Sequence, residues 1–278
     1  MSRTAGAVRT AVLSAVAVLT AAPFLWMLST SLKPGADVFA SPPKWIPDPL
    51  TLHAYRVALT QLPFGRYLFN SVLVTLTIVA SNVVFATVAA YAFAKLRFPG
   101  RDVIFFTLLL TLMIPYQVNL IPLYRMMVRL HEISPHLGVD TYFGLIAPNA
   151  VGVFGIFLMR QFLASIPDSV LEAARLDGAS ELRIITRIVF PLARPGIAAM
   201  AIFVFLNSWN DFLWPLLVID SDNMRTLPVG LALLQRRNTV VWPETMAGVV
   251  ITVVPMLIVF AVLQRRFVEG LTAGAVRD

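Results

Sequence analysis

The sequence contains no cysteine, and this absence excludes several kinds of chemistry. Without thiols there can be no disulfide framework, no thiolate nucleophile and no zinc site of the usual cysteine-containing kind. The three histidines, His53, His131 and His136, are scattered along the chain. We therefore expect no metal site and no nucleophile–base set of the kind that enzymes use.

Charge is also scarce. Asp, Glu, Lys and Arg make up 13% of the 278 residues, whereas soluble domains carry about 25%. Hydrophobic residues make up 58%, and the mean hydropathy is +0.78. This balance predicts an integral membrane protein. The net charge of +7 does not indicate nucleic-acid binding, because the basic residues sit at the ends of apolar runs, where they set membrane orientation.

Six apolar runs are long enough to cross a bilayer, which takes about 20 helical residues. The fold class we predict is an all-α integral membrane protein with six transmembrane helices. Prolines and polar residues interrupt the third and fifth runs, whose ends are the least defined. The first run also resembles a signal peptide, but it continues past the length of a signal core, which favours an uncleaved span. The runs are 11–32, 71–94, 103–124, 142–162, 196–219 and 246–263.

The distribution of Lys and Arg predicts that both termini are cytoplasmic. The strongest single signal is the tight turn KLRFPGR, residues 95–101, which carries three basic residues in seven. We therefore expect three parts: a first helix with an extracytoplasmic loop (1–70), a five-helix core (71–263) and a cytoplasmic tail (264–278). In the second run, Asn82, Ala86, Ala90 and Ala94 recur every four residues. That small-residue face fits packing within the chain and contact with a second subunit equally well.

A charged, helix-prone segment, residues 165–194, separates the fourth and fifth runs. It predicts two short helices joined by a turn. Ser165 or Asp168 caps the first helix, Asp177 and Gly178 end it, and Ser180 caps the second. Glu172 is placed to face Arg175 at i,i+3. An ordinary solvated loop resting on lipid headgroups would show much of this pattern.

The pattern is more specific than that, because it resembles the EAA signature of permeases of bacterial ABC importers. That signature reads Glu-Ala-Ala, three residues, Gly, nine residues, then Ile-x-Leu-Pro, and this chain departs from it only at Phe190, where the pattern has Leu. The stretches 89–100, 121–127, 206–218 and 264–278 resemble the carbohydrate-uptake branch, the maltose-permease type. The matching residues of the signature are Glu172, Ala173, Ala174, Gly178, Ile188 and Pro191.

This resemblance implies a function for the charged segment. In such importers the EAA loop is a cytoplasmic coupling helix that docks on a separate ATPase, with Glu172 carrying the contact and Gly178 the turn. It implies as partners a second permease subunit, two ATPase subunits and an extracytoplasmic solute-binding protein. ATP and Mg²⁺ would be bound by the ATPase, and this chain would hold no cofactor; it lacks the phosphate-binding pattern Gly-x-x-x-x-Gly-Lys-Ser/Thr. The coupling residues would be Glu172, Ala173, Ala174, Asp177, Gly178, Arg183, Arg187 and Pro191.

Polar side chains inside the runs are candidates for a solute path, because a polar group in hydrocarbon needs a partner or a wet cavity. The fifth run holds a cluster of them around Asp211. This cluster is either a hydrogen-bonded group that fixes a bent helix or the lining of a path; amides suit hydroxyl-rich solutes. The candidate path residues are Asn207, Asn210, Asp211, Asn149, Gln117 and Asn119.

The function we predict is therefore that of a non-catalytic permease subunit in the bacterial inner membrane. It would move a carbohydrate, polyol or sugar phosphate, driven by separate ATPase subunits. The alternative is a self-sufficient secondary carrier, which would be expected to show two repeated halves and several ionisable residues at mid-membrane. The sequence shows neither a repeat nor more than one acid in a span. It does not identify the solute.

Overall fold

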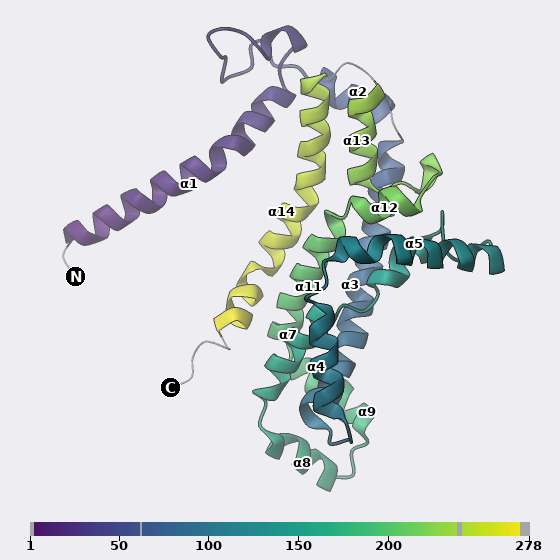
Figure 1. The fold of residues 1–278 in the computed structure, drawn as a ribbon. Helices are drawn as coiled ribbons and strands as arrows, with labels where there is room; N and C mark the ends of the chain where they lie inside the picture. Colours follow the sequence, from purple (N-terminus) through teal and green to yellow (C-terminus); the bar gives the residue numbers. More distant parts are fainter. Residues whose placement is uncertain (1–2, 62, 238–240, 273–278) are drawn as a thin grey trace. The chain divides into compact units, whose positions relative to one another are not determined.

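The computed structural model describes residues 3–61, 63–237 and 241–272 and contains helices but no strand among them (Figure 1). The chain forms two compact units. The first comprises the chain up to Gly65 together with Leu227–Pro255, and the second comprises Arg66–Thr226 together with the chain from Met256 onward. The predicted all-α fold class is confirmed. The predicted division at residues 70 and 263 stays a prediction.

The first unit contains the long N-terminal helix, two short helices that follow it, and helices from near the C-terminus. Its helices are α1 (Arg3–Ser31), η1 (Gly35–Asp37), α2 (His53–Gln61), α13 (Leu227–Arg237) and the first half of α14 (Trp242–Thr272). Ala54 and Ala58 of α2 pack with Ala247 of α14 in a small core. The hydroxyls of Ser31 and Tyr55 are 2.8 Å apart and tie the end of α1 to α2.

The second unit is built around α3 (Phe64–Lys95), a helix of 32 residues. Around it lie two sets of shorter helices. The first set is α4 (Arg101–Thr111), α5 (Tyr116–Ile133), α6 (Tyr142–Ile146), η2 (Ala147–Asn149) and α7 (Val153–Ala164). The second set is α8 (Asp168–Leu176), α9 (Glu181–Ile184), η3 (Ile185–Val189), α10 (Phe190–Leu192), α11 (Arg194–Trp209), α12 (Leu213–Val218) and η4 (Asp222–Met224).

Three of the six predicted spans are single helices that are long and apolar enough to cross a membrane. They lie at Gly6–Ser31, Phe64–Lys95 and Trp242–Val262. Three further helix pairs meet the same length and composition test only if each bent pair is counted as one span. The described residues therefore hold between three and six spans, in agreement with six apolar runs of which several are broken.

The third predicted span, 103–124, is the one that differs most from a straight helix. It is split into α4 and α5, which meet at an angle of 98°, and α5 runs across the direction of α4 (Figure 1). Pro115 lies at the break, before the first residue of α5. Proline cannot donate a backbone hydrogen bond and its ring crowds the preceding turn, so Pro115 favours a break between α4 and α5.

The fifth predicted span, 196–219, is also divided. Helix α11 ends at Trp209, and the separate helix α12 begins at Leu213. Towards the N-terminus, α11 is joined to Glu181–Leu192 through a bend of 79°. That bend falls at Ala193, between Pro191 and Pro195. The prolines therefore mark the boundary between the charged segment and the fifth run, as the sequence predicted.

Two apolar clusters hold the second unit together. One joins Ala86 and Ala90 of α3 to Met159 of α7 and Met200 of α11, all of them buried. A methyl group on Gly155 of α7 would lie 3.3 Å from the Cβ of Ala86, so these helices approach closely. The small-residue face of α3 therefore packs within the chain at Ala86 and Ala90. The second cluster includes Val74, Leu120, Leu145, Trp214 and Val218.

Candidate functional sites: the charged loop and a polar cavity

The charged segment folds as predicted into two helices with a turn between them. Helix α8 ends at Leu176, and Gly178 then adopts a φ of +78°, which costs a residue with a Cβ but not glycine. The Ala179 N–H donates to the Ala174 carbonyl and the Gly178 N–H to the Arg175 carbonyl, each at 3.0 Å. These two bonds make a Schellman motif, which satisfies carbonyls at the helix end. The predicted role of Gly178 as a helix stop is confirmed.

The predicted N-cap is correct for α9 and wrong for α8. Ser180 caps α9 as expected, because its hydroxyl accepts a hydrogen bond from the Arg183 N–H. Neither predicted cap of α8 acts as one. The Ser165 hydroxyl donates to the Phe162 carbonyl, and Asp168 is the first residue of α8, after Pro167. The Asp168 carboxylate is used instead in an ion pair with Lys95.

The turn between α8 and α9 is exposed and carries both apolar and polar side chains. Leu176 is 89% exposed and Leu182 is 72% exposed, so two large apolar side chains flank Gly178. A Cβ added to Gly178 would meet nothing within 4 Å. These leucines were not among the predicted coupling residues, although Leu176 lies only two residues before the helix-ending Gly178. Exposed apolar side chains gathered at one place on a protein surface mark an interaction site when they form a contiguous patch, and this pair would be the centre of one.

The predicted coupling residues divide into exposed and packed ones. Ala174 is the packed one and lies against the core cluster of the second unit. Helix α8 also anchors itself there through Leu171, which is 1% exposed. The face available to a partner therefore runs along one side of α8 and over the turn. The exposed members are Glu172, Ala173, Asp177, Gly178, Arg183, Arg187 and Pro191.

The expected pair between Glu172 and Arg175 does not form. Arg175 instead donates through Nε to Glu181 Oε1 at 2.8 Å, across the turn. An i,i+3 pair on a helix surface stabilises by only about 0.2–0.5 kcal/mol. The Schellman turn brings Glu181 within reach, and Tyr91 adds a second contact to Arg175 Nη2 at 3.2 Å. Glu172 is left exposed and free of any ion pair recorded among the described residues.

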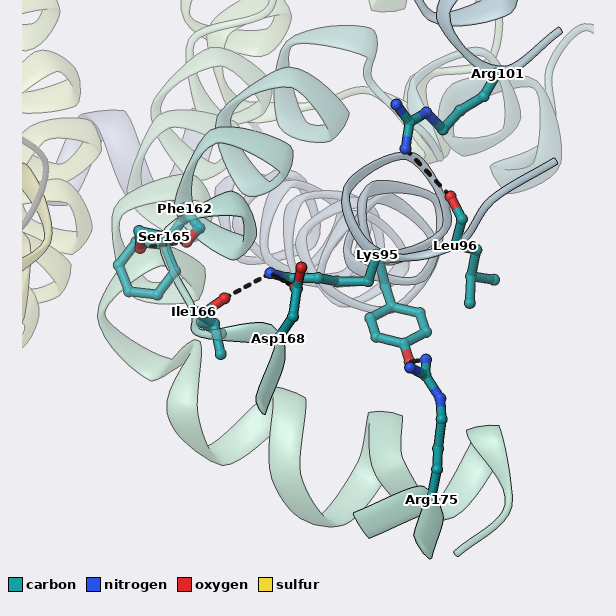
Figure 2. A network of polar contacts seen from close by, with 9 residues as sticks. Lys95, Leu96, Arg101, Phe162, Ser165, Ile166, Asp168 and Arg175 are labelled. Carbon is teal, nitrogen blue, oxygen red and sulfur yellow. Dashed lines mark hydrogen bonds and ion pairs between the residues drawn. The ribbon is translucent and has the colours of Figure 1, made fainter. Parts of the chain in front are cut away.

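The start of α8 is tied to the end of α3. Lys95 Nζ donates to the Ile166 carbonyl at 2.5 Å and to Asp168 Oδ1 at 2.6 Å (Figure 2). The Lys95 side chain is 5% exposed. This hydrogen bond and the charge of Lys95 hold the pKa of the Asp168 carboxyl below its ordinary value. In Figure 2 the Lys95 side chain points towards Ile166 and Asp168, and Arg175 points from α8 towards the end of α3.

A second candidate site is a cavity of about 370 Å³ in the second unit. Three of the predicted path residues, Asn149, Asn207 and Asp211, line it together. They come from η2, from α11 and from the break before α12, so the irregular backbone at 210–212 serves to place Asp211 at the wall. Asp211 Oδ1 also accepts a hydrogen bond from the Trp214 N–H at 3.4 Å. The remaining walls are Ile78, Asn82, Tyr116, Gly152, Phe154, Gly155, Phe203, Val204 and Ser208.

The other three predicted path residues are not among those that line this cavity. Asn210 is exposed and donates to the Leu206 carbonyl at 2.8 Å. Gln117 and Asn119 are exposed on α5. The 98° bend between α4 and α5 explains their position, because it turns the first residues of α5 away from the line of a continuous span. Their role in a path stays a prediction.

Asn82 and Tyr116 also line the cavity but were not among the predicted path residues. Asn82 is 2% exposed, and its amide accepts from the Gly152 N–H at 2.7 Å and donates to the Asn149 carbonyl at 2.9 Å. Tyr116 stands at the break between α4 and α5. Asn82 had been noticed only as part of a small-residue face. A buried amide in an apolar run was the signal that could have singled it out.

A family described as the binding-protein-dependent transport system inner membrane component matches residues 82–272. The match covers the charged loop, α3 from Asn82 to its end, and every residue that lines the cavity except Ile78. The chain belongs to this family. It is therefore a permease that resides in the membrane, and the resemblance drawn from the EAA signature is confirmed.

Individual permeases show how closely the chain follows the family. It is 36% identical over 265 residues to the arabinooligosaccharides transport system permease protein AraQ of Halalkalibacterium halodurans, covering 94% of this chain and 93% of that one. It is 33% identical over 243 residues to the sn-glycerol-3-phosphate transport system permease protein UgpE of Escherichia coli O1:K1, covering 84% of each.

A solved structure also matches this permease. It is the crystal structure of a bacterial ABC transporter involved in the import of the acidic polysaccharide alginate. The TM-score is 0.81 and the sequence identity 27%, and the match covers 96% of this chain and 99% of the other.

Proposed function

We infer that this permease is one of two similar membrane subunits of an ATP-driven importer for a carbohydrate, a polyol or a sugar phosphate. The family and the relatives support this, since AraQ is named for arabinooligosaccharides, UgpE for sn-glycerol-3-phosphate and the solved transporter for alginate. The solutes in these names range from neutral to anionic. What they share is an array of hydroxyl groups, and that chemistry is the one we assign to the transported solute.

The observation that carries the proposal is the construction of the loop at 165–194. It consists of two short helices, α8 and α9, joined by a Schellman turn at Gly178, and it exposes Leu176 and Leu182. We propose that it docks on a separate ATPase subunit on the cytoplasmic side, with both termini of this chain on that side. Moving a two-state gate from 1:99 to 99:1 takes about 5.5 kcal/mol of differential binding. A rigid helical loop that two ATPase conformations bind with different affinity can supply part of this free energy.

The cavity is the proposed contribution of this chain to the solute path. Its polar groups include one carboxyl, Asp211, and five side chains that donate and accept hydrogen bonds without fixed charge: Asn82, Tyr116, Asn149, Asn207 and Ser208. Phe154 and Phe203 add aromatic faces whose ring centroids are 5.5 Å apart. Amides, a hydroxyl and aromatic faces together match a solute with many hydroxyls and an apolar ring face.

The remaining partners follow from the same proposal. A second permease subunit would complete the path, a pair of ATPase subunits would bind ATP and Mg²⁺, and an extracytoplasmic binding protein would deliver the solute. The chain itself is proposed to be non-catalytic. Alternating access would arise from rigid-body rocking of the two membrane subunits.

Reconstitution tests the proposal. The permease pair is placed in proteoliposomes with or without ATPase subunits and with a loaded binding protein, and uptake of labelled arabinooligosaccharide, glycerol 3-phosphate and alginate oligosaccharide is measured. We expect uptake of one class that requires both ATP and the ATPase. Uptake driven by an ion gradient without the ATPase would contradict the proposal and support a secondary carrier instead.

A further inference from the structure

Helix α3 touches both halves of the charged loop near its C-terminal end. Lys95 holds the entry to α8 through Ile166 and Asp168. Four residues earlier, and therefore on the same helix face, Tyr91 reaches the turn between α8 and α9. Two residues of one helix thus grip the loop at both ends of α8.

Tyr91 makes its contact with one hydroxyl that is shared by two partners. Its Oη donates to Glu181 Oε2 at 2.5 Å and accepts from Arg175 Nη2 at 3.2 Å. Arg175 belongs to α8 and Glu181 to α9, so the hydroxyl bridges both sides of the turn. Tyr91 itself is 1% exposed, and its ring lies in the apolar cluster that joins α3 to α7 and α11. The contact therefore connects the exposed turn directly to the core.

The same helix also forms a wall of the cavity. Asn82, nine residues before Tyr91, lines the cavity and holds the start of α7 through the Gly152 N–H. Nine helical residues span about 14 Å. Between Asn82 and Lys95, α3 contains neither proline nor a break. A displacement of the loop that pulls on Tyr91 and Lys95 must therefore reach the cavity wall through a single rigid helix.

We propose that Tyr91 and Lys95 are positioning residues that transmit the movement of the charged loop through α3 to the polar cavity. This rests on the proposed function, since it requires that the loop is moved by an ATPase and that the cavity belongs to the solute path. It adds a route that the EAA signature does not contain, because neither residue lies within it. In this proposal α3 moves as one rigid helix, and the Tyr91 and Lys95 side chains attach it to the loop.

The structure offers a variant that separates attachment from folding. Arg175 and Glu181 bond each other directly at 2.8 Å, so the turn keeps its internal ion pair when the tyrosine hydroxyl is removed. Tyr91→Phe therefore leaves the aromatic ring in the core and the turn closed, but it removes the hydrogen bonds that connect α3 to the turn. Lys95→Gln detaches the other end of α8, and Lys95→Arg restores a cationic donor at the same place.

The test uses the complete reconstituted importer and three readouts: affinity for the ATPase, rate of ATP hydrolysis, and solute transported per ATP hydrolysed. We expect Tyr91→Phe and Lys95→Gln each to lower the transport-to-hydrolysis ratio by about tenfold, the scale of one lost hydrogen bond to a charged group. ATPase affinity should stay within about twofold in both. Lys95→Arg should recover most of the ratio. The matched control is Asp102→Asn, which breaks the Arg101–Asp102 pair near the same helix end without touching the loop.

A wild-type ratio in Tyr91→Phe and Lys95→Gln would overturn the proposal. So would a loss of ATPase affinity in proportion to the loss of transport, since that result would show that the two residues only hold the loop in shape. If the wild-type permease fails to bind the ATPase at all, the proposed function itself is wrong, and this outcome is recognised before any variant is compared.

Discussion

The Asn82 side chain accepts a hydrogen bond from the Gly152 N–H at 2.7 Å and donates one to the Asn149 carbonyl at 2.9 Å. One buried amide of α3 thus satisfies the backbone on both sides of the break between η2 and α7. Helix ends leave unpaired backbone groups, and in a membrane no water is available to satisfy them. Asn82 therefore stabilises the interrupted helix beside the cavity, together with Ser81, whose hydroxyl donates to the Ala150 carbonyl at 2.6 Å.

Replacing Asn82 with leucine should therefore destabilise the permease markedly. The variant removes the side-chain partner of the Gly152 N–H and of the Asn149 carbonyl, and each buried group left unpaired costs about 1–3 kcal/mol. Thermal unfolding in detergent, followed by tryptophan fluorescence, measures the loss. The control is Asn119→Leu, at an exposed position of α5, which should unfold at the wild-type temperature. Equal unfolding temperatures for the two variants would refute the assigned role of Asn82.

Gly178→Ala should weaken ATPase docking while Gly35→Ala should not. Both glycines have open space around the position of a Cβ, but only Gly178 has a positive φ, of +78°. An alanine there costs about 1–2 kcal/mol in the left-handed region, and that cost shifts the turn away from its docking shape. Titration of the reconstituted permease with ATPase subunits measures the affinity. An unchanged affinity in Gly178→Ala would show that the turn geometry is not needed for docking.

Asp211→Ala should lower solute transport at normal ATPase affinity, because Asp211 lines the cavity. It also accepts a hydrogen bond from the Trp214 N–H in the first turn of α12, so Asp211→Asn, which keeps an acceptor, separates the two roles. We expect low transport in both variants if the carboxyl serves the path. Asp220→Ala, at the other end of α12, is the matched control and should transport normally. Wild-type transport by Asp211→Asn together with a defect in Asp211→Ala would favour the packing role alone.

The attachment of α8 to α3 should depend on pH only in strongly acidic solution. Lys95 lowers the pKa of Asp168 from its ordinary value of 3.8, so the ion pair contributes stability above that pH and loses it as the pH falls through the lowered value. Because the chain has no cysteine, a single spin label at Leu176→Cys can report the mobility of α8. We expect constant mobility from pH 8 to about pH 4 and an increase below. In the Asp168→Asn background the acid transition should become smaller, and the remainder belongs to Glu181, whose pKa the hydrogen bond from Arg175 also lowers; a transition near neutral pH would contradict this assignment.

The sequence was sufficient for features that depend on local chemistry. The turn at Gly178, the cap at Ser180 and the stop between Pro191 and Pro195 all follow from what glycine, serine and proline do to a backbone. Three polar residues of the cavity, Asn149, Asn207 and Asp211, were also predicted, because uncompensated polarity in an apolar run is visible without a structure.

Features that depend on distant pairing could not be predicted. Arg175 was assigned to Glu172, its neighbour on the helix, and the structure pairs it with Glu181 across the turn. Asn82 holds backbone groups that lie 67 to 70 residues further along the chain. The angle between α4 and α5 is set by packing. Pro115 predicts a break in the helix but not its direction, so the sequence could not show that Gln117 lies outside the lining of this cavity.

Labelling from one side of the membrane tests the central claim, that the loop at 165–194 is a cytoplasmic docking element. Leu176→Cys would be the only thiol in the chain, and the Leu176 side chain is 89% exposed. A membrane-impermeant maleimide is applied to inside-out and right-side-out vesicles, with and without added ATPase subunits. The account predicts labelling only in inside-out vesicles and protection by the ATPase. Labelling in right-side-out vesicles, or labelling that the ATPase does not reduce, would contradict it.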